Sequence, residues 1–149
     1  MRKRNSLLFI LMFGLVVISI SRDMTGCAVR GTVVHKVTVA EHNFRFTVQA
    51  FQDAEIAAHN QALVPDDLHL KMQGAILKIA LAGKDLDDSL AAGASTPTIK
   101  AKLDAIYSLL DSLNSDGVLG VKNPTTKATL EIALDSIKAI IDNALTQVQ

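Results

Sequence analysis

The chain has 149 residues, of which 49% are apolar, 20% charged and 4% aromatic. This apolar content excludes an intrinsically disordered chain, which has low hydrophobicity and a high net charge. The 15 basic and 15 acidic residues balance overall, but 11 basic and 14 acidic residues follow Cys27, so that part is mildly acidic. With no Trp and one Tyr to stack on bases, we expect no nucleic-acid partner.

The N-terminal segment combines a basic cluster with an apolar run. Arg-Lys-Arg at positions 2–4 precedes an uncharged stretch from Leu7 to Ile20. The stretch is shorter than the ~20 residues that a spanning helix normally needs, and its length is typical of the apolar region of a signal peptide. We therefore predict a signal peptide or signal anchor over residues 1–27, followed by one domain over residues 28–149.

The end of this segment reads Met24-Thr25-Gly26-Cys27, with a small residue immediately before the cysteine. The tetrapeptide resembles the lipobox of bacterial lipoproteins, and the resemblance covers residues 1–28. It implies that the Cys27 thiol carries a diacylglycerol and that the mature chain carries further acyl chains such as palmitate. It also implies a lipid anchor in the cell membrane or outer membrane, with the domain on the extracytoplasmic side. Ala28 after the cysteine favours the outer membrane within that family.

Two other fates of the N-terminal segment remain open. In one, the stretch from Leu7 to Ile20 is an uncleaved anchor in the membrane lipid, and the chain is a small bitopic membrane protein of a bacterial envelope or a phage. In the other, cleavage follows Ser21 and the domain is secreted. Cys27 is the only cysteine, so an intrachain disulfide is impossible and the fold depends on its core.

Two segments with helical periodicity follow. The first runs from Thr32 or Thr38 to Leu63, and Thr38 with Glu41 has the spacing of a capping box, which would start the helix at Thr38. The second covers residues 66–92, and its glycines would allow close approach of a neighbouring helix. Apolar residues recur three or four positions apart in each. The stripes are Val33, Val37, Ala40, Phe44, Val48, Phe51, Ala54, Ala58 and Ala62 in the first segment, and Leu68, Met72, Ile76, Ile79, Gly83, Leu86 and Leu90 in the second.

Two further segments each begin at a proline. Thr96-Pro97 and Asn123-Pro124 place a capping residue before a proline, which is a frequent helix start. Their stripes are Ile99, Leu103, Ile106, Leu110 and Leu113 in the third segment, and Leu130, Leu134, Ile137, Ile141, Ala144 and Val148 in the fourth. We expect the loop Ser115–Asn123, which is partly apolar, to fold over one end of the domain. The sequence therefore predicts an all-α fold, a single up-down-up-down four-helix bundle preceded by the N-terminal apolar helix.

The polar residues form no recognisable catalytic constellation. Mid-helix serines such as Ser108 have no neighbouring histidine, and no Gly-x-Ser-x-Gly elbow occurs, so we expect neither enzymatic activity nor a cofactor. Glu55 and His59 are four residues apart and share a helix face, which makes them a weak candidate metal pair. A di-iron bundle needs Glu-x-x-His on two helices, and that repeat is missing. We therefore predict a solvated Glu–His pair and no metal site.

Val39 and Phe46 lie outside the core stripe of the first helix. They are either additional core residues or, if exposed, a contact surface. The first functional hypothesis is a membrane-tethered, non-catalytic structural or interaction module of the bacterial cell envelope, which binds a protein partner or itself. The second is a small-ligand or metal carrier that uses the bundle interior. A filled core with an exposed apolar helix face would favour the first, and a polar-lined interior cavity the second.

Overall fold

The computed structural model describes residues 33–149, which form four α-helices and one short 3-10 helix and contain no strand. Helix α2 covers Val33–Asn60, α3 covers Asp66–Ala91, α4 covers Thr96–Asp116, η1 covers Val118–Gly120 and α5 covers Pro124–Gln147. The predicted signal segment and Cys27 lie outside the described residues. Within residues 33–149, none of the helices has an apolar stretch that could cross a membrane.

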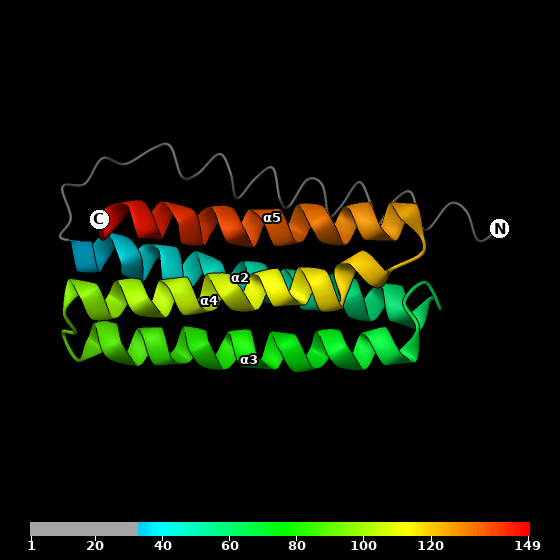
Figure 1. Cartoon of the computed structure of the whole chain (residues 1–149), viewed down its shortest axis with the longest axis horizontal. Coiled ribbons are helices and arrows are strands. Elements are labelled where there is room, and N and C mark those ends of the chain that lie inside the picture. Colours follow the sequence, from blue (N-terminus) through cyan, green and yellow to red (C-terminus); the bar gives the residue numbers. More distant parts are fainter. Residues whose placement is uncertain (1–32) are drawn as a thin grey trace. The chain divides into compact units, whose positions relative to one another are not determined.

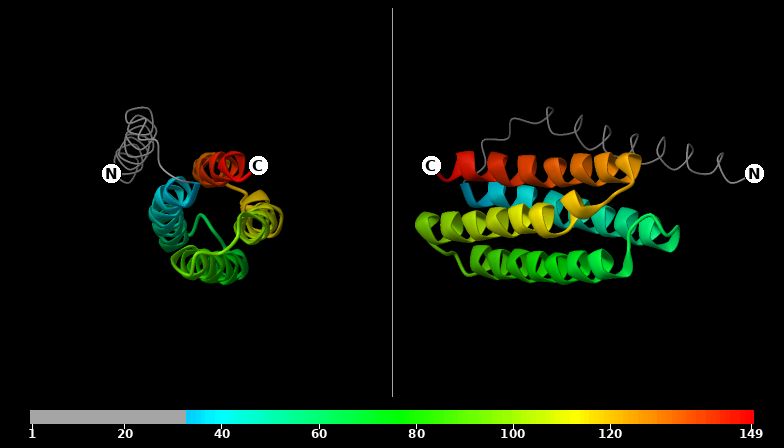
Figure 2. Two further views of the ribbon diagram at one scale, coloured as in Figure 1. Left: turned by 90° about the vertical axis from the view of Figure 1, so that its left-hand side faces the viewer. Right: turned by 45° about the vertical axis from the view of Figure 1, so that its right-hand side comes forward.

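The four long helices lie side by side and alternate in direction (Figure 1). Seen end-on, each helix occupies one corner of a square, so that α2 and α4 each lie between α3 and α5 (Figure 2). Lys36 near the start of α2 donates a hydrogen bond to Gln147 at the end of α5, with Nζ and Oε1 2.9 Å apart. Because the start of one helix meets the end of the other, α2 and α5 are antiparallel. The predicted all-helical fold with four helices is confirmed.

The core is built from the four apolar stripes that the sequence predicts. Its largest fully buried side chains are Phe44, Phe51, Met72, Ile79, Leu86, Ile99, Leu103, Ile106, Leu110, Leu113, Leu130 and Leu134. Burial of one such side chain stabilises the fold by about 1.5–3 kcal/mol. Gly83 lets α3 approach α2 closely, because an added Cβ would lie 2.8 Å from Cε1 of Phe44. Gly74, in contrast, is exposed, and an added Cβ there would have no atom within 4 Å.

The predicted helix start at Asn123-Pro124 is confirmed, and the start near Pro97 differs from the prediction by one residue. Asn123 caps α5, and its side-chain oxygen accepts a hydrogen bond from the backbone N–H of Thr126 at 2.9 Å. Helix α4 begins at Thr96, with Pro97 in its first turn, so its N-cap is Ser95 and not the predicted Thr96. Proline is favourable at these positions because the first backbone N–H groups of a helix have no partner within the helix.

The start of α2 differs from the capping-box expectation. The described helix already includes Val33, so Thr38 lies within it and is not its first residue. Glu41 does not complete a capping box either, because its carboxylate is paired with Arg45 one turn later. The end also differs slightly, since α2 stops at Asn60, before the predicted end. Ala62, the last residue of the predicted stripe, therefore lies in the following turn and is exposed, not in the core.

The connection between α4 and α5 packs over one end of the bundle, as expected from its apolar residues. Val118 and Val121 are buried, whereas Leu119 is half exposed. The short helix η1 contacts both α4 and α5. Gly120 lies under the side chain of Leu68, where an added Cβ would be 3.0 Å from Cδ2. This loop is therefore part of the core and not a free surface.

Candidate functional site

Val39 and Phe46, the contact residues predicted from the sequence, lie on the surface of α2. They are 48% and 58% exposed, so they are not additional core residues. Because they are seven positions apart, which is about two helical turns, they share one face of the helix. They form a small apolar patch, and its role as a contact surface stays a prediction.

A longer apolar surface lies on α3, outside the stripes that were predicted from the sequence. Leu70, Leu77 and Leu81 are 70%, 61% and 59% exposed. Their spacing of seven and four positions places them on one helix face, and Gly74 lies on the same face between the first two. We call these four residues the leucine face. The spacing of three or four residues that predicts the core stripe of α3 also relates the residues of this second stripe. The second stripe lies on the opposite side of the same helix.

The leucine face has polar residues along both sides and a depression beside it. Lys71 and Lys78 follow one side, and Asp66 and Gln73 follow the other. A depression of about 740 Å³ lies between α3 and α4, and its α3 wall includes Leu70, Gly74 and both lysines. It opens to solvent, because these lining residues are exposed. An apolar centre with a polar rim is the usual composition of a protein-binding surface.

Glu55 is fully buried where α2 packs on α3. Its carboxylate accepts hydrogen bonds from Nδ1 of His69 at 2.9 and 3.1 Å and from Nε2 of Gln73 at 2.6 Å. Gln73 also accepts a hydrogen bond from Gln52, 2.9 Å away. The prediction of a solvated Glu–His pair was wrong for Glu55. It lies four residues after Phe51, on the core stripe of α2, and this position was the signal that could have revealed its burial.

The two histidines of this region stack on each other. The ring centroids of His59 and His69 are 3.9 Å apart, with an angle of 9° between the rings. Nδ1 of His59 lies 3.1 Å from the carbonyl oxygen of Val64, which can only accept, so this nitrogen carries the proton. The carboxylate of Glu55 is thus paired with the imidazole of His69 on α3, and not with the imidazole of His59. Among residues 33–149, no three His, Cys, Asp or Glu side chains are grouped to hold a metal ion.

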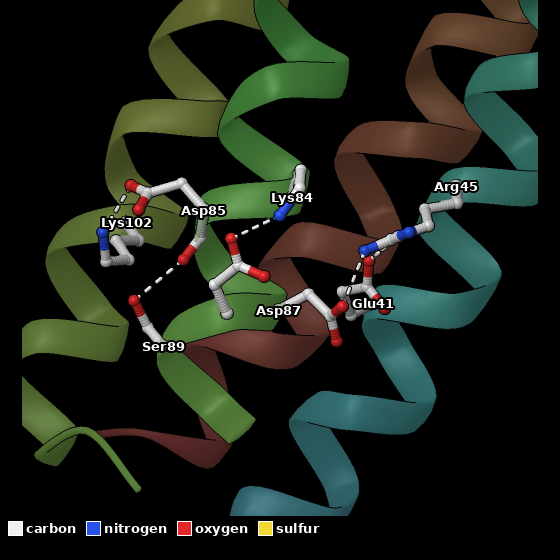
Figure 3. A network of polar contacts seen from close by, with 8 residues as sticks. Glu41, Arg45, Lys84, Asp85, Asp87, Ser89 and Lys102 are labelled. Atoms are coloured by element: carbon white, nitrogen blue, oxygen red, sulfur yellow. Dashed lines mark hydrogen bonds and ion pairs between the residues drawn. The ribbon is translucent and has the colours of Figure 1, made fainter. Parts of the chain in front are cut away.

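A second polar network joins α2, α3 and α4 (Figure 3). Arg45 of α2 pairs with the buried Glu41 and with Asp87 of α3, whose Oδ2 is 3.0 Å from Nη2. The hydrogen bond that Arg45 donates to the Glu41 carboxylate raises the pKa of Arg45, with a smaller contribution from Asp87 and against the effect of burial, so the guanidinium stays cationic. Lys102 of α4 pairs with Asp85 of α3. These contacts link α3 to both of its neighbouring helices.

Comparison with protein-family models, curated proteins and solved structures finds no match to this chain. The leucine face is an apolar surface of the bundle that does not contribute to its core.

Proposed function

We propose that the chain is a membrane-tethered, non-catalytic interaction module of the bacterial cell envelope, which binds a protein partner through the leucine face of α3. The observation that carries this proposal is the exposure of Leu70, Leu77 and Leu81 on the side of α3 that faces away from the bundle core. Covering one such side chain in an interface contributes up to about 1.5–3 kcal/mol. A partner therefore gains affinity from residues that do not stabilise the isolated bundle.

The tether in this proposal is the lipid on Cys27, or the stretch from Leu7 to Ile20 if that segment is not cleaved. Tethering matters for a surface of this size, because confinement to one membrane raises the effective concentration of two binding partners. Three leucines with a polar rim would form only a weak complex in dilute solution. The same surface is sufficient when both partners are held in one membrane.

The bundle interior gives less support to the alternative of a small-ligand or metal carrier. Such a carrier needs polar groups that face a cavity. The buried Glu55, His69 and Gln73 instead satisfy one another through hydrogen bonds. The large side chains of the four stripes fill the remaining interior. The interaction hypothesis is therefore the better supported of the two.

The tether is tested by intact mass spectrometry of the full-length chain, expressed in a bacterium and extracted from its membranes. We expect a mass equal to residues 27–149 plus acyl chains, and we expect that species to be absent from a Cys27→Ala variant. A full-length mass in both proteins would contradict lipidation and indicate a permanent anchor. Recovery of the chain in the soluble fraction alone would contradict the tether itself.

The binding surface is tested by photo-cross-linking in the same membranes. Benzoylphenylalanine replaces Leu77 on the leucine face or, as a matched control, Ile132 of α5, which is 58% exposed. We expect light-dependent adducts to a protein at position 77 and few at position 132, with the adduct identified by mass spectrometry. Equal yields at the two positions, or adducts to lipid alone, would rule out the leucine face as a protein-binding surface.

A further inference from the structure

We propose that the leucine face binds an amphipathic helix of another protein, whose apolar stripe covers the leucines and whose edge toward Lys71 and Lys78 carries carboxylates. This inference rests on the proposed function and names the kind of partner for the same surface. It follows from three observations: the depression between α3 and α4, the two lysines beside it that have no ionic partner, and the partners that the other charges around the face already have within the bundle.

The shape of the surface fits a helix. The depression beside the leucine face lies between two neighbouring helices, and its apolar lining includes Leu70 and Ala75 of α3 and Leu109 of α4. Two packed helices leave a groove between their side chains into which the ridge of a third helix can fit. Leu81 is 11 positions after Leu70, which corresponds to about 16 Å or three turns, and this sets the length of the partner's apolar stripe. A partner strand has no edge to pair with, because residues 33–149 contain no strand.

The two lysines beside the depression have no ionic partner of their own. Within the part of the chain that the structure describes, neither Lys71 nor Lys78 forms an ion pair or a hydrogen bond. The third lysine of α3, Lys84, and both lysines of α4 are instead paired with aspartates. Lys71 and Lys78 are seven positions apart and both line the depression, so they present two ammonium groups along the same edge of the leucine face. The complementary group on a partner is a carboxylate.

The other charges around the leucine face already have a stabilising partner within the bundle. At the C-terminal end of the face, two aspartates pair with lysines of this chain: Asp85 with Lys102 and Asp88 with Lys84. At the N-terminal end, Asp66 and Asp67 lie in the first turn of α3, where the positive end of the helix dipole stabilises carboxylates. Asp66 also lies 4.0 Å from Nε2 of His59. The charges of this face that remain for a partner are therefore the two lysines.

Lys78 is the better placed of the two lysines. The far wall of the depression includes Asp116, at the end of α4. This aspartate lies at the level of Lys71, because the adjacent Gly117 packs against the side chain of Met72. Its negative charge weakens the attraction between Lys71 and a carboxylate of the partner. Lys78 lies about two turns further along α3, away from Asp116, so we expect the stronger ion pair there.

Two other occupants fit the same face less well. A helix that lies on an anionic membrane carries lysines or arginines along its polar face, whereas the leucines of α3 are followed at both ends by aspartates, Asp67 before them and Asp85 and Asp88 after them. Lipid headgroups would repel these aspartates, but a partner helix of three turns lies between them. The leucine face of a second copy does not supply the carboxylates either, because its own aspartates already have partners within their bundle.

Charge reversal in the photo-cross-linking experiment tests the acidic edge. The full-length chain with benzoylphenylalanine in place of Leu77 is combined, in bacterial membranes, with Lys78→Glu, Lys71→Glu or Lys122→Glu. Lys122 is the matched control, because it is exposed, forms no ion pair within residues 33–149 and does not line the depression. We expect the yield of the protein adduct to fall roughly threefold to tenfold for Lys78→Glu, by less for Lys71→Glu, and not for Lys122→Glu. Thermal unfolding shows whether each variant is folded.

A charge exchange between the two proteins tests the same contact in the other direction. Tandem mass spectrometry of the adduct locates the residue of the partner that reacts with position 77. We expect this residue to lie in an amphipathic helix that has an acidic residue within two turns of it. Changing that acidic residue to lysine should restore the adduct of the Lys78→Glu chain, and a variant that had merely lost its fold would not be rescued in this way.

The outcomes separate this inference from the proposed function. If a folded Lys78→Glu chain gave as much of the same adduct as Lys122→Glu, or if the reacting segment of the partner had no acidic residue, the acidic helix would be wrong, although the leucine face would still bind a protein. An adduct to a second copy of this chain would overturn the inference in the same way. Adducts to phospholipid alone would overturn both the inference and the proposed function.

Discussion

Glu55 of α2 is linked to α3 by hydrogen bonds at the contact between the two helices. Its buried carboxylate accepts hydrogen bonds from His69 and Gln73, so Glu55→Ala would leave two donors without their acceptor inside the bundle. We expect this substitution to lower the free energy of unfolding by about 2–4 kcal/mol, because unsatisfied buried donors add to the lost packing. Urea unfolding followed by circular dichroism measures the change.

The control for this prediction is Asp53→Ala on the exposed side of the same helix. It removes a carboxylate of nearly the same size without affecting the interior, and should change the unfolding free energy by less than about 0.5 kcal/mol. If Glu55→Ala were as mild as Asp53→Ala, the hydrogen bonds to His69 and Gln73 would not hold the two helices together.

Arg45 neutralises the buried carboxylate of Glu41, and its removal would leave that charge without its nearest partner. We expect Arg45→Ala to cost about 1 kcal/mol, a small value because the arginine itself is half exposed to solvent. Adding Glu41→Gln to Arg45→Ala removes the uncompensated charge and should recover part of the loss. A double-mutant cycle from urea unfolding measures the coupling, and strictly additive effects would contradict it.

The pH dependence of this pair follows from the direction of its pKa shift. The pKa of Arg45 is raised in the folded chain by the hydrogen bond that its guanidinium donates to Glu41. A raised pKa contributes stability that is present at every pH below the ordinary pKa of arginine and is lost only in strong alkali. The guanidinium therefore contributes no change in stability across the neutral range.

At the scale of single helices, two glycines of α3 lie in opposite environments. In Gly83→Ala the added Cβ would lie 2.8 Å from the buried ring of Phe44. We expect this crowding, which typically costs about 1–3 kcal/mol, to exceed the gain of about 1 kcal/mol in helix propensity. Gly74→Ala meets no atom and should raise the stability of the bundle by about 0.5–1 kcal/mol.

Thermal unfolding of the two glycine variants checks this pair of predictions. The protein is diluted below the concentration at which it associates. The melting temperature then depends only on packing within one copy. We expect opposite signs for the two changes in melting temperature. A stabilising Gly83→Ala would mean that the ring of Phe44 moves aside easily, and that α2 and α3 are less tightly packed than the contact indicates.

The helices of this bundle could be predicted from the sequence because each carries its own local signals. The core stripes and the proline starts act within one turn or one helix, so Leu86 or Pro124 can be placed without knowing the partner helix. Glu55 could not be paired correctly by the same reasoning, because its hydrogen-bond partner His69 comes from another helix. The start of α2 was predicted wrongly at Thr38, because the spacing of a capping box caps a helix only where the helix begins, and α2 already includes Val33.

The leucine face was missed for a different physical reason. One face of the predicted helix carries Leu70, Leu77 and Leu81. Leucine is among the residue types that are most often buried, so this face was not predicted to be exposed. A two-sided apolar helix is unusual in an isolated soluble domain, since one side must remain in water. Such a pattern on α3 is therefore better interpreted as a contact surface than as excess core.

At the scale of the whole molecule, α3 has two faces with separate roles, and one substitution applied to each face distinguishes them. Leu86 is buried on the core side, and Leu86→Gln places a polar group among apolar side chains. We expect it to destabilise the bundle by about 3 kcal/mol or more. The triple change of Leu70, Leu77 and Leu81 to Gln lies in water and should alter the free energy of unfolding by no more than about 0.5 kcal/mol.

The triple change should weaken binding of a partner, although it leaves the free energy of unfolding nearly unchanged. Chemical cross-linking in bacterial membranes should recover far fewer protein adducts from the folded triple variant than from the unsubstituted chain. If the triple variant were instead destabilised by several kcal/mol, the three leucines would be packed within one copy, and α3 would have no face free for a partner. A folded triple variant that still forms the same adducts would place the interface elsewhere, and the exposed pair Val39 and Phe46 on α2 would then be the next surface to substitute.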